Sequence, residues 1–241
     1  MTAAERLFHA LENDFGISGA KGELSFRLKD YHIVVEQNNV IGSILEEWLG
    51  KWMNSRGIPN EHNTAQSSPD FWLNPDNKNE DWLEVKAFTG SPNFDVAAFR
   101  SFIQLAIDKP WKLHSQHLLL KYKMQDGIVT VENCWLKNLW EICSSSASWP
   151  VKVQCKRGII FNIRPATWYA VSPSYPAFSS LEHFLAAVEE TIYKYHDTRA
   201  TIAEHWTERL IESYRKHYGR ELIIPRWNDI KNLYLPEQNE P

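Results

Sequence analysis

Apolar side chains recur at helical spacing in two segments near the start of the chain. The first begins at the capping-box pair Thr2 and Glu5 and ends near Gly16, and the second spans about residues 39–54. Apolar positions three or four residues apart fall on one side of an α-helix, so each segment is predicted to be a helix with one buried face. Along the chain, these positions are Leu7, Phe8, Leu11, Phe15, Ile41, Ile44, Leu45, Trp48, Leu49 and Trp52.

Short extended segments between turn residues follow in the middle of the chain. In the segment 81–88 apolar and polar positions alternate, which predicts a strand with Leu83, Val85 and Ala87 on one face. Asp126-Gly127 separates two apolar runs and predicts a hairpin. The predicted strands span 24–36 (as one or two segments), 69–73, 81–88, 117–124, 128–135, 151–155 and 158–163.

Three further helices are predicted over 94–107, 179–196 and 198–218, with Ser179 and Glu182 as the capping pair of the second. Loops are expected at 58–67, 74–80 and 164–178, and a polar tail at 232–241. Helices on both sides of a group of strands predict an α/β (α+β) fold, with a central mixed sheet of five or six strands flanked by helices.

Composition narrows the class of protein. The 241-residue chain is 43% hydrophobic and 23% charged, which is ordinary for a globular protein. Since no apolar run reaches the roughly 18 residues of a membrane span, and no secretory signal is visible, no membrane association is expected. The three cysteines are odd in number and lack Cys-x-x-Cys spacing, so the sequence favours a reducing cytoplasm over a disulfide scaffold or a structural zinc site.

Three charged side chains are predicted to converge where the strands 69–73 and 81–88 pair. Residues i and i+2 of a strand share a face, so Glu84 and Lys86 point to the same side. If the two strands pair across the intervening turn, Asp70 faces Glu84. Two carboxylates and a lysine suit phosphodiester hydrolysis, in which a metal ion neutralises charge and a base or cation acts near the attacking water.

The carboxylate-x-lysine spacing is weak evidence by itself. Asp76-Asn77-Lys78 and Asp229-Ile230-Lys231 satisfy it too, and Glu84 and Lys86 are equally compatible with a solvated strand face. Context distinguishes Asp70 and Glu84-Val85-Lys86, because they lie one hairpin apart in strand-like segments.

Pro69-Asp70, thirteen further residues and Glu84-Val85-Lys86 resemble the Pro-Asp…(Asp/Glu)-x-Lys core of type II restriction endonucleases, the PD-(D/E)xK superfamily. Over about residues 35–170 the chain resembles the EcoRV-like branch, and more specifically the NgoBV/NlaIV family. The resembling segments are Val40–Glu46, Leu83–Phe88, Ser91–Asp95 and Gly158–Pro165. The resemblance implies a site-specific deoxyribonuclease that hydrolyses double-stranded DNA at a short palindrome (GGNNCC-like) and leaves 5'-phosphate ends.

The resemblance also implies a role for each side chain of the core. Asp70 and Glu84 are expected to hold Mg²⁺ with a phosphate oxygen and waters, an all-oxygen site of the kind that magnesium prefers. Lys86 is expected to position or deprotonate the attacking water, and Glu46 to tune or complete a second metal position. Helical geometry alone does not choose between Glu46 and Glu47. Glu84 stands where the EcoRV-like pattern has Asp, which lengthens this ligand by one methylene.

A major-groove recognition loop is expected, from the same resemblance, after the last predicted strand. Arg164 is the expected guanine contact, since Arg to guanine is the commonest specific contact, and Asn162 and Thr167 lie beside it. A phosphate contact or a salt bridge is the alternative for Arg164. Asn63 and Gln66 lie in a loop that resembles the minor-groove-facing loop of the EcoRV-like branch.

On this interpretation residues 1–231 form a single nuclease domain. Its parts are a catalytic core at about 39–135, a recognition segment at about 150–178 and C-terminal helices at 179–219, followed by the tail at 232–241. The formal net charge of −4 argues against a protein that coats DNA non-specifically. Residues 109–167 nevertheless hold nine Lys/Arg and three acidic residues, which is compatible with a locally basic site beside metal-binding carboxylates.

A palindromic site calls for a two-fold symmetric reader, so a homodimer is expected. The first helix and the helix with Trp48 and Trp52 are the candidate dimer surfaces, and ordinary packing into the core is the alternative for both. A restriction role also requires a cognate DNA methyltransferase in the host, as a functional partner. The alternative functions are a repair or junction nuclease of the same core and a non-catalytic DNA-binding module.

Overall fold

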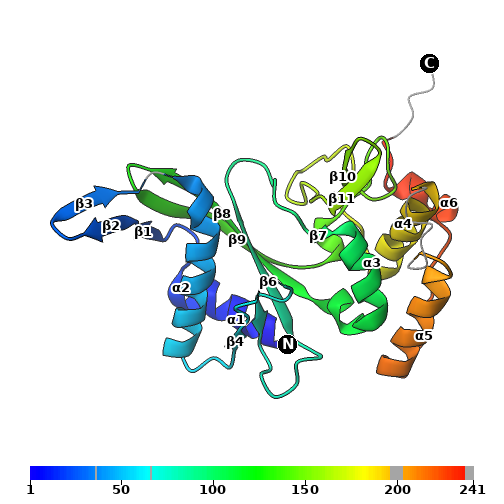
Figure 1. Cartoon of the computed structure of the whole chain (residues 1–241), viewed down its shortest axis with the longest axis horizontal. Coiled ribbons are helices and arrows are strands. Elements are labelled where there is room, and N and C mark those ends of the chain that lie inside the picture. The colour runs from blue at the N-terminus through cyan, green and yellow to red at the C-terminus, as the bar shows by residue number, and fades with distance from the viewer. Residues whose placement is uncertain (36, 66, 196–202, 237–241) are drawn as a thin grey trace. The chain divides into compact units, whose positions relative to one another are not determined.

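The computed structural model describes residues 1–35, 37–65, 67–195 and 203–236 (Figure 1). The chain divides into two compact units, of which the first comprises Met1–Ser91 and Ser115–Lys137 and the second comprises Pro92–His114 and Asn138–Pro241. Among the described residues, no helix combines the length and the apolar character needed to traverse a lipid bilayer. All three cysteines are free thiols.

Six strands form the sheet of the first unit: β1 (Lys21–Glu23), β4 (Glu61–His62), β5 (Phe71–Trp72), β6 (Trp82–Phe88), β8 (Gln116–Gln125) and β9 (Ile128–Asn138). Their spatial order is β1-β9-β8-β6-β5-β4. β6 runs parallel to β8, whereas the pairs β1/β9, β4/β5 and β5/β6 are antiparallel. The predicted fold class, with a central mixed sheet of five or six strands, is confirmed. Asp126 and Gly127, between β8 and β9, both have positive φ, as a tight hairpin turn requires.

Helices α1 (Ala3–His9) and α2 (Ile41–Ser55) pack on one face of this sheet. The capping box of α1 forms as predicted, because Thr2 Oγ1 accepts a hydrogen bond from Glu5 N at 3.1 Å and Glu5 Oε2 accepts one from Thr2 N at 2.7 Å. A π-helical turn, Ala10–Phe15, continues α1.

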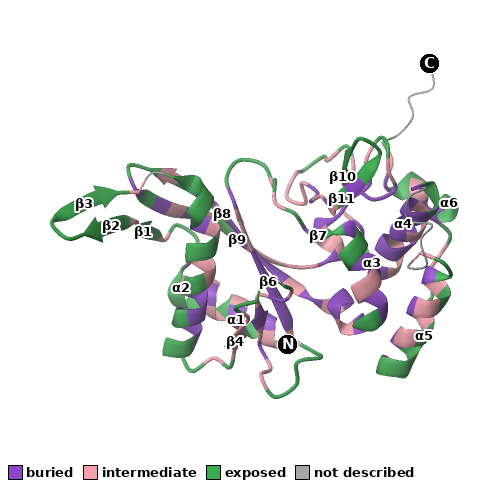
Figure 2. Cartoon of the chain, in the orientation of Figure 1, coloured by how far each residue is buried: buried purple, intermediate pink, exposed green. Residues whose placement is uncertain are grey.

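The core of the first unit lies between these helices and the sheet, where purple buried residues gather in Figure 2. Its members include Leu7, Leu11, Leu49, Met53, Leu83, Val85, Leu118 and Leu120. Because Leu83 and Val85 of β6 face this core, Glu84 and Lys86 point to the other face of the sheet.

Strands β2 (Ser25–Leu28) and β3 (Tyr31–Val34) form a separate antiparallel hairpin in the first unit. The register pairs Phe26 with Ile33 and Leu28 with Tyr31, and directly paired residues share a face. One face of the hairpin is therefore entirely apolar. These four side chains are between 53% and 81% exposed, and the hairpin is green in Figure 2.

The described residues of the second unit form four α-helices and a three-stranded sheet. The helices are α3 (Phe99–Asp108), α4 (Leu181–Lys194), α5 (Trp206–Tyr218) and α6 (Trp227–Ile230), and the strands are β7 (Ala97–Ala98), β10 (Val153–Lys156) and β11 (Ile159–Ile163) in the order β10-β11-β7. The rings of Phe102 in α3 and Phe184 in α4 meet edge-to-face at 5.6 Å. Trp206 Nε1 donates to the carbonyl of Ile103 at 2.8 Å and anchors α5 on α3.

Three predicted elements differ from the structure for local reasons. The helix predicted over 94–107 begins only at Phe99, because Ala97 and Ala98 pair with β11 instead. Ser180, rather than Ser179, caps α4, since Ser180 Oγ accepts from His183 N at 3.2 Å. The loop predicted over 58–67 contains the two-residue strand β4.

The C-terminal region is more ordered than the sequence pattern indicates. Helix α6 was not predicted, and Tyr234, within the predicted tail at 232–241, is buried with its hydroxyl 2.6 Å from His183 Nδ1. The helix predicted over 198–218 begins at Trp206 within the described part of the chain, while residues 198–202 and 237–241 lie outside the described residues.

Candidate active site

Asp70, Glu84 and Lys86 converge in the first unit, where β5 pairs with β6. The antiparallel register matches Phe71 with Leu83, so Asp70, one residue before β5, lies opposite Glu84. Lys86 Nζ is 3.4 Å from Glu84 Oε2 and 3.7 Å from Asp70 Oδ2. The structure therefore brings these three side chains together, and we call them the acidic–lysine cluster.

Backbone and side-chain hydrogen bonds hold the two carboxylates in place. Asp70 Oδ2 accepts a hydrogen bond from the Val85 amide at 2.6 Å. Ser68 Oγ donates to Glu84 Oε1. The side chains of Glu84, Asp70 and Lys86 are only 8%, 20% and 22% exposed, so the alternative of a solvated strand face is wrong.

Burial and mutual proximity perturb the protonation of the cluster. Burial, together with the Glu84 charge, raises the pKa of Asp70 to about 6, although Lys86 and the Val85 amide act in the opposite sense. Burial alone would lower the pKa of Lys86, but the carboxylates of Glu84 and Asp70 outweigh it and raise that pKa. Lys86 is therefore held as an ammonium ion between two carboxyl groups.

Glu46 and Glu47 of α2 lie in different surroundings. Glu46 Oε1 is 2.8 Å from His62 Nε2, and the Glu46 charge contributes to raising the pKa of both Asp70 and Lys86. Glu47 pairs with Lys51 at 2.7 Å, and its side chain is 63% exposed. Of the two residues that helical periodicity left open, Glu46 is the one whose charge acts on Asp70 and Lys86.

The donor set of the cluster fits a hard divalent cation. Among the described residues no group of three or more His, Cys, Asp or Glu side chains is arranged to hold a metal ion. Magnesium, however, is commonly bound by one or two carboxylates, with the other positions taken by waters and substrate phosphate oxygens. Asp70 and Glu84 supply two such carboxylates, and a cation would offset the Glu84 charge, which acts together with burial to raise the pKa of Asp70.

Asn63, a candidate base contact from the sequence, is hydrogen-bonded within its own loop. Its Nδ2 donates to the carbonyls of Ser67 at 2.7 Å and Pro69 at 2.9 Å, and its backbone amide donates to the Asp70 carbonyl at 2.9 Å. Asn63 thus supports the segment that leads into Asp70. Gln66, the other candidate in this loop, lies outside the described residues.

The candidate recognition residues lie in the second unit, at the end of β11 and just beyond it. The guanidinium of Arg164 donates to the Asp95 carboxylate and to the Asn93 carbonyl. Asn162 Nδ2 donates to Gln154 Oε1 at 3.3 Å, across the β10/β11 pair. Thr167 lines a pocket of about 390 Å³. The salt bridge that was one alternative for Arg164 is therefore formed.

Two residues of the acidic–lysine neighbourhood were missed from the sequence. His62 lies in a strand of two residues, which is too short to show alternation, and its contact with Glu46 is tertiary. Ser68 precedes Pro69-Asp70, and only the hydrogen bond to Glu84 reveals its place. The sequence signal for Ser68 was its place directly before the Pro-Asp pair. The sequence held no such signal for His62.

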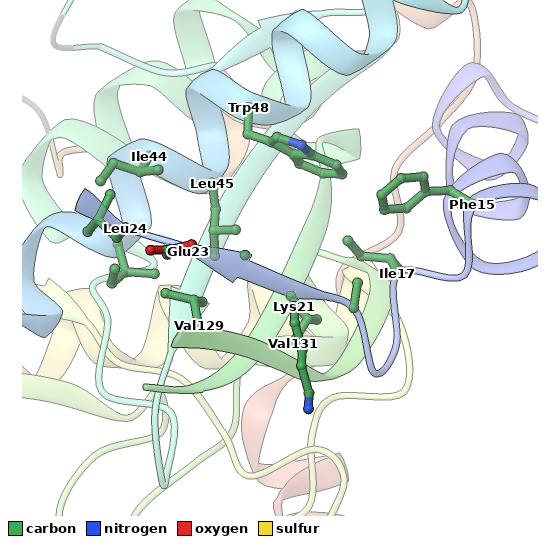
Figure 3. A pocket seen from close by; sticks show the side chains of 13 residues that line it. Phe15, Ile17, Lys21, Glu23, Leu24, Ile44, Leu45, Trp48, Val129 and Val131 are labelled. Atoms are coloured by element: carbon green, nitrogen blue, oxygen red, sulfur yellow. The ribbon is translucent and has the colours of Figure 1, made fainter. Parts of the chain in front are cut away.

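An apolar pocket of the first unit lies apart from this chemistry (Figure 3). Its volume is about 200 Å³, and residues of α2, β1 and β9 line it, among them Ile44, Leu45, Trp48, Val129 and Val131. None of the candidate site residues lines this pocket. The chemistry points to the acidic–lysine cluster instead.

Comparisons with known proteins show the family of the chain. The sequence model of the NgoBV restriction endonuclease family matches residues 1–234. The chain is 39% identical to the type II restriction enzyme NlaIV of Neisseria lactamica over 236 residues, which covers 96% of this chain and 97% of the relative. It is 35% identical to the type II restriction enzyme NgoBV of Neisseria gonorrhoeae over 159 residues, covering 64% of this chain and 90% of the relative. A solved structure of the NlaIV restriction endonuclease superposes with a TM-score of 0.91, at 38% identity over 98% of both chains.

Proposed function

The chain belongs to the NgoBV restriction endonuclease family, and on that premise we propose how it cuts double-stranded DNA. It is a type II restriction endonuclease, and enzymes of this class generally use a divalent metal ion. We propose that the ion is Mg²⁺, that the site is a short GGNNCC-like palindrome, and that the products carry 5'-phosphate ends. Family membership favours this function over a repair or junction nuclease and over a non-catalytic DNA-binding module.

The convergence of Asp70, Glu84 and Lys86 is the observation that supports this proposal most. Asp70 and Glu84 would hold the cation, with the Val85 amide and the Ser68 hydroxyl fixing their orientation. Glu46 would complete the metal environment from α2. A bound Mg²⁺ would neutralise the charge that develops on the scissile phosphate and make a nucleophilic water available.

Lys86 is the residue that would act on the reacting groups. Paired with two carboxylates, its ammonium group orients the attacking water and stabilises negative charge on the phosphate. The water oxygen bonds to phosphorus and gives up a proton to solvent, the P–O3' bond breaks, and the departing 3' oxygen takes up a proton from solvent. The products are a 5'-phosphate and a 3'-hydroxyl.

Recognition of the DNA is proposed for the second unit. Arg164 would exchange its contact with Asp95 for the edge of a guanine, and Asn162 and Thr167 would add polar contacts nearby. Gln66 is proposed to reach DNA from the loop before Pro69. Asn63 is better placed to support that loop than to contact a base.

We propose that the working enzyme is a homodimer. One acidic–lysine cluster cuts one strand, so a double-strand break at a palindrome calls for a second copy of the chain. The first helix and Trp52 contribute to the core of the first unit, which is the alternative interpretation of these two segments. The exposed apolar face of the β2–β3 hairpin, formed by Phe26, Leu28, Tyr31 and Ile33, is the proposed contact for the second copy. A cognate methyltransferase would protect the host DNA in the cytoplasm.

Digestion of plasmid DNA tests this function. With Mg²⁺ the enzyme is expected to give discrete fragments, and end sequencing is expected to place every cut at one palindrome with a 5'-phosphate. With a chelator no fragments are expected. Nicks or junction cuts would favour the repair enzyme, and an absence of cleavage at all enzyme and metal concentrations would refute the proposal.

A further inference from the structure

His62 makes a contact that the proposed chemistry leaves unexplained. Its Nε2 lies 2.8 Å from Glu46 Oε1, at hydrogen-bond distance, with the imidazole N–H as donor to the carboxylate. His62 belongs to β4, at the edge of the sheet, and Glu46 belongs to α2. This bond therefore joins the helix that supplies Glu46 to the sheet that supplies the acidic–lysine cluster.

The imidazole of His62 is itself fixed by β5. His62 pairs with Phe71 in the β4/β5 register, and the two rings stack with centroids 4.6 Å apart and an interplanar angle of 19°. Phe71 is fully buried and directly follows Asp70. Since the imidazole rests on Phe71, the position of the Glu46 carboxylate is set by the same strand that positions Asp70.

Glu47 provides an internal contrast on the same helix. It pairs with the exposed Lys51 at 2.7 Å, an ion pair of the kind that solvent weakens. The side chains of Glu46 and His62 are less exposed, at 28% and 34%. Only Glu46 of the two is held from a neighbouring strand.

We propose that His62 is a positioning residue, which holds the Glu46 carboxylate toward the acidic–lysine cluster so that Glu46 takes part in binding the cation. Residues that orient metal ligands in this way affect metal affinity or activity by about 10- to 100-fold when they are replaced. The inference deepens the proposed function and rests on it, because it assumes that a divalent cation binds at this cluster.

Two substitutions separate the hydrogen bond from the ring. His62→Phe keeps an aromatic ring to stack on Phe71 and removes the donor. His62→Gln removes the ring and keeps an N–H donor for Glu46. Glu46→Gln and the double variant His62→Phe/Glu46→Gln complete a mutant cycle, and Glu47→Gln is the matched control on α2.

The readouts are Mn²⁺ affinity of the full chain without DNA, by titration calorimetry, and the Mg²⁺ concentration for half-maximal cleavage of plasmid DNA. His62→Phe is expected to weaken Mn²⁺ binding by about 10- to 100-fold and to raise the Mg²⁺ requirement in parallel. His62→Gln is expected to stay closer to wild type, and Glu47→Gln to match it. In the Glu46→Gln background, His62→Phe is expected to have no further effect.

The inference would be overturned if His62→Phe bound Mn²⁺ with wild-type affinity. It would also be overturned if His62→Phe caused the same loss of Mn²⁺ affinity in the Glu46→Gln background as in the wild-type background. Thermal unfolding checks that each variant folds. If His62→Phe does not fold, His62→Gln must bind Mn²⁺ more tightly than Glu46→Gln, and equal affinities refute the inference. Failure of the proposed function is distinguishable, because the wild-type enzyme itself would then show no metal-dependent cleavage.

Discussion

At the scale of single residues, the structure separates side chains that build the site from those available to DNA. Asn63 belongs to the first group, since its amide spans the Ser67 and Pro69 carbonyls just before Asp70. Arg164 forms an intramolecular salt bridge with Asp95, and DNA would have to replace Asp95 in order to contact Arg164. Neither assignment follows from residue type, because both asparagine and arginine are also common base-contacting residues.

Replacement of Asn63 is expected to damage the site without altering sequence preference. Asn63→Ala removes three hydrogen bonds and should lower the free energy of unfolding by about 1–3 kcal/mol and slow cleavage. Denaturant unfolding and cleavage of cognate against single-base-changed duplexes measure both effects. Asn60→Ala, which removes bonds to Asn54 in α2 and to the Ile58 carbonyl, is the control expected to spare cleavage. A changed base preference in Asn63→Ala would restore the base-contact interpretation.

Arg164 and Asp95 should behave differently when they are replaced separately. Arg164→Gln is expected to relax discrimination at one base pair by about 1–3 kcal/mol, because a bidentate guanine contact is lost. Asp95→Asn removes the charged partner of Arg164 in the free enzyme and should retain the base preference. Competitive cleavage of duplexes that differ at single positions measures the discrimination. Identical profiles for the two variants and wild type would leave Arg164 as a purely structural salt bridge.

At the scale of elements, strong sequence patterns identified the parts of the fold that carry the cluster. The alternation in β6 and the turn before it were sufficient to place Asp70 opposite Glu84, because a hairpin register follows from local geometry. β4 and the contact of His62 with Glu46 were not predictable, since they depend on how α2 packs against the sheet edge. The start of α3 was misplaced because pairing of Ala97 and Ala98 with β11 overrides their helical pattern.

The packing of α5 against the 3₁₀ turn Pro110–His114 predicts a dependence of stability on pH. His114 Nε2 bonds to the Tyr214 hydroxyl at 2.9 Å, and burial, with the Arg220 charge, lowers the pKa of His114 to about 4. The Glu182 charge acts in the opposite sense. The unfolded chain binds this proton more readily than the folded one. The contribution of His114 to the free energy of unfolding is therefore fully present above about pH 6.5 and is lost as the pH falls toward 4.

This contribution amounts to about 3 kcal/mol across the window, and it should be absent from His114→Gln. Denaturant unfolding between pH 7 and pH 4 measures the difference between the variant and wild type. His205→Gln, at an exposed histidine before α5, is the control expected to follow wild type. Parallel stability curves for wild type and His114→Gln would contradict the buried, neutral state of His114.

At the scale of the whole molecule, the β2–β3 hairpin bears on assembly. Phe26 and Ile33 are cross-strand neighbours on its apolar face, whereas Arg27 and His32 form the pair on the opposite face. A continuous apolar surface of this kind is typical of a contact with a partner.

The double substitution Phe26→Ser/Ile33→Ser is therefore expected to weaken the proposed homodimer by at least about tenfold, since an apolar side chain that becomes buried in a contact is worth roughly 1.5–3 kcal/mol. Sedimentation equilibrium measures the dissociation constant. Arg27→Ser/His32→Ser changes the opposite face of the hairpin and should leave the dissociation constant near that of wild type. An unchanged dimer in the apolar-face variant would place the interface elsewhere.

We assign the cleavage of DNA to the acidic–lysine cluster of Asp70, Glu84 and Lys86. The most direct measurement is the single-turnover cleavage rate of Lys86→Ala at a DNA occupancy matched to wild type. Lys78→Ala is the control, because Lys78 ends the similar Asp76-Asn77-Lys78 triplet but pairs with Glu61 on the surface. We expect Lys86→Ala to bind cognate DNA and to lose about 10²–10⁴-fold in rate, while Lys78→Ala cleaves normally. A Lys86→Ala enzyme that cuts at a near wild-type rate would contradict this assignment.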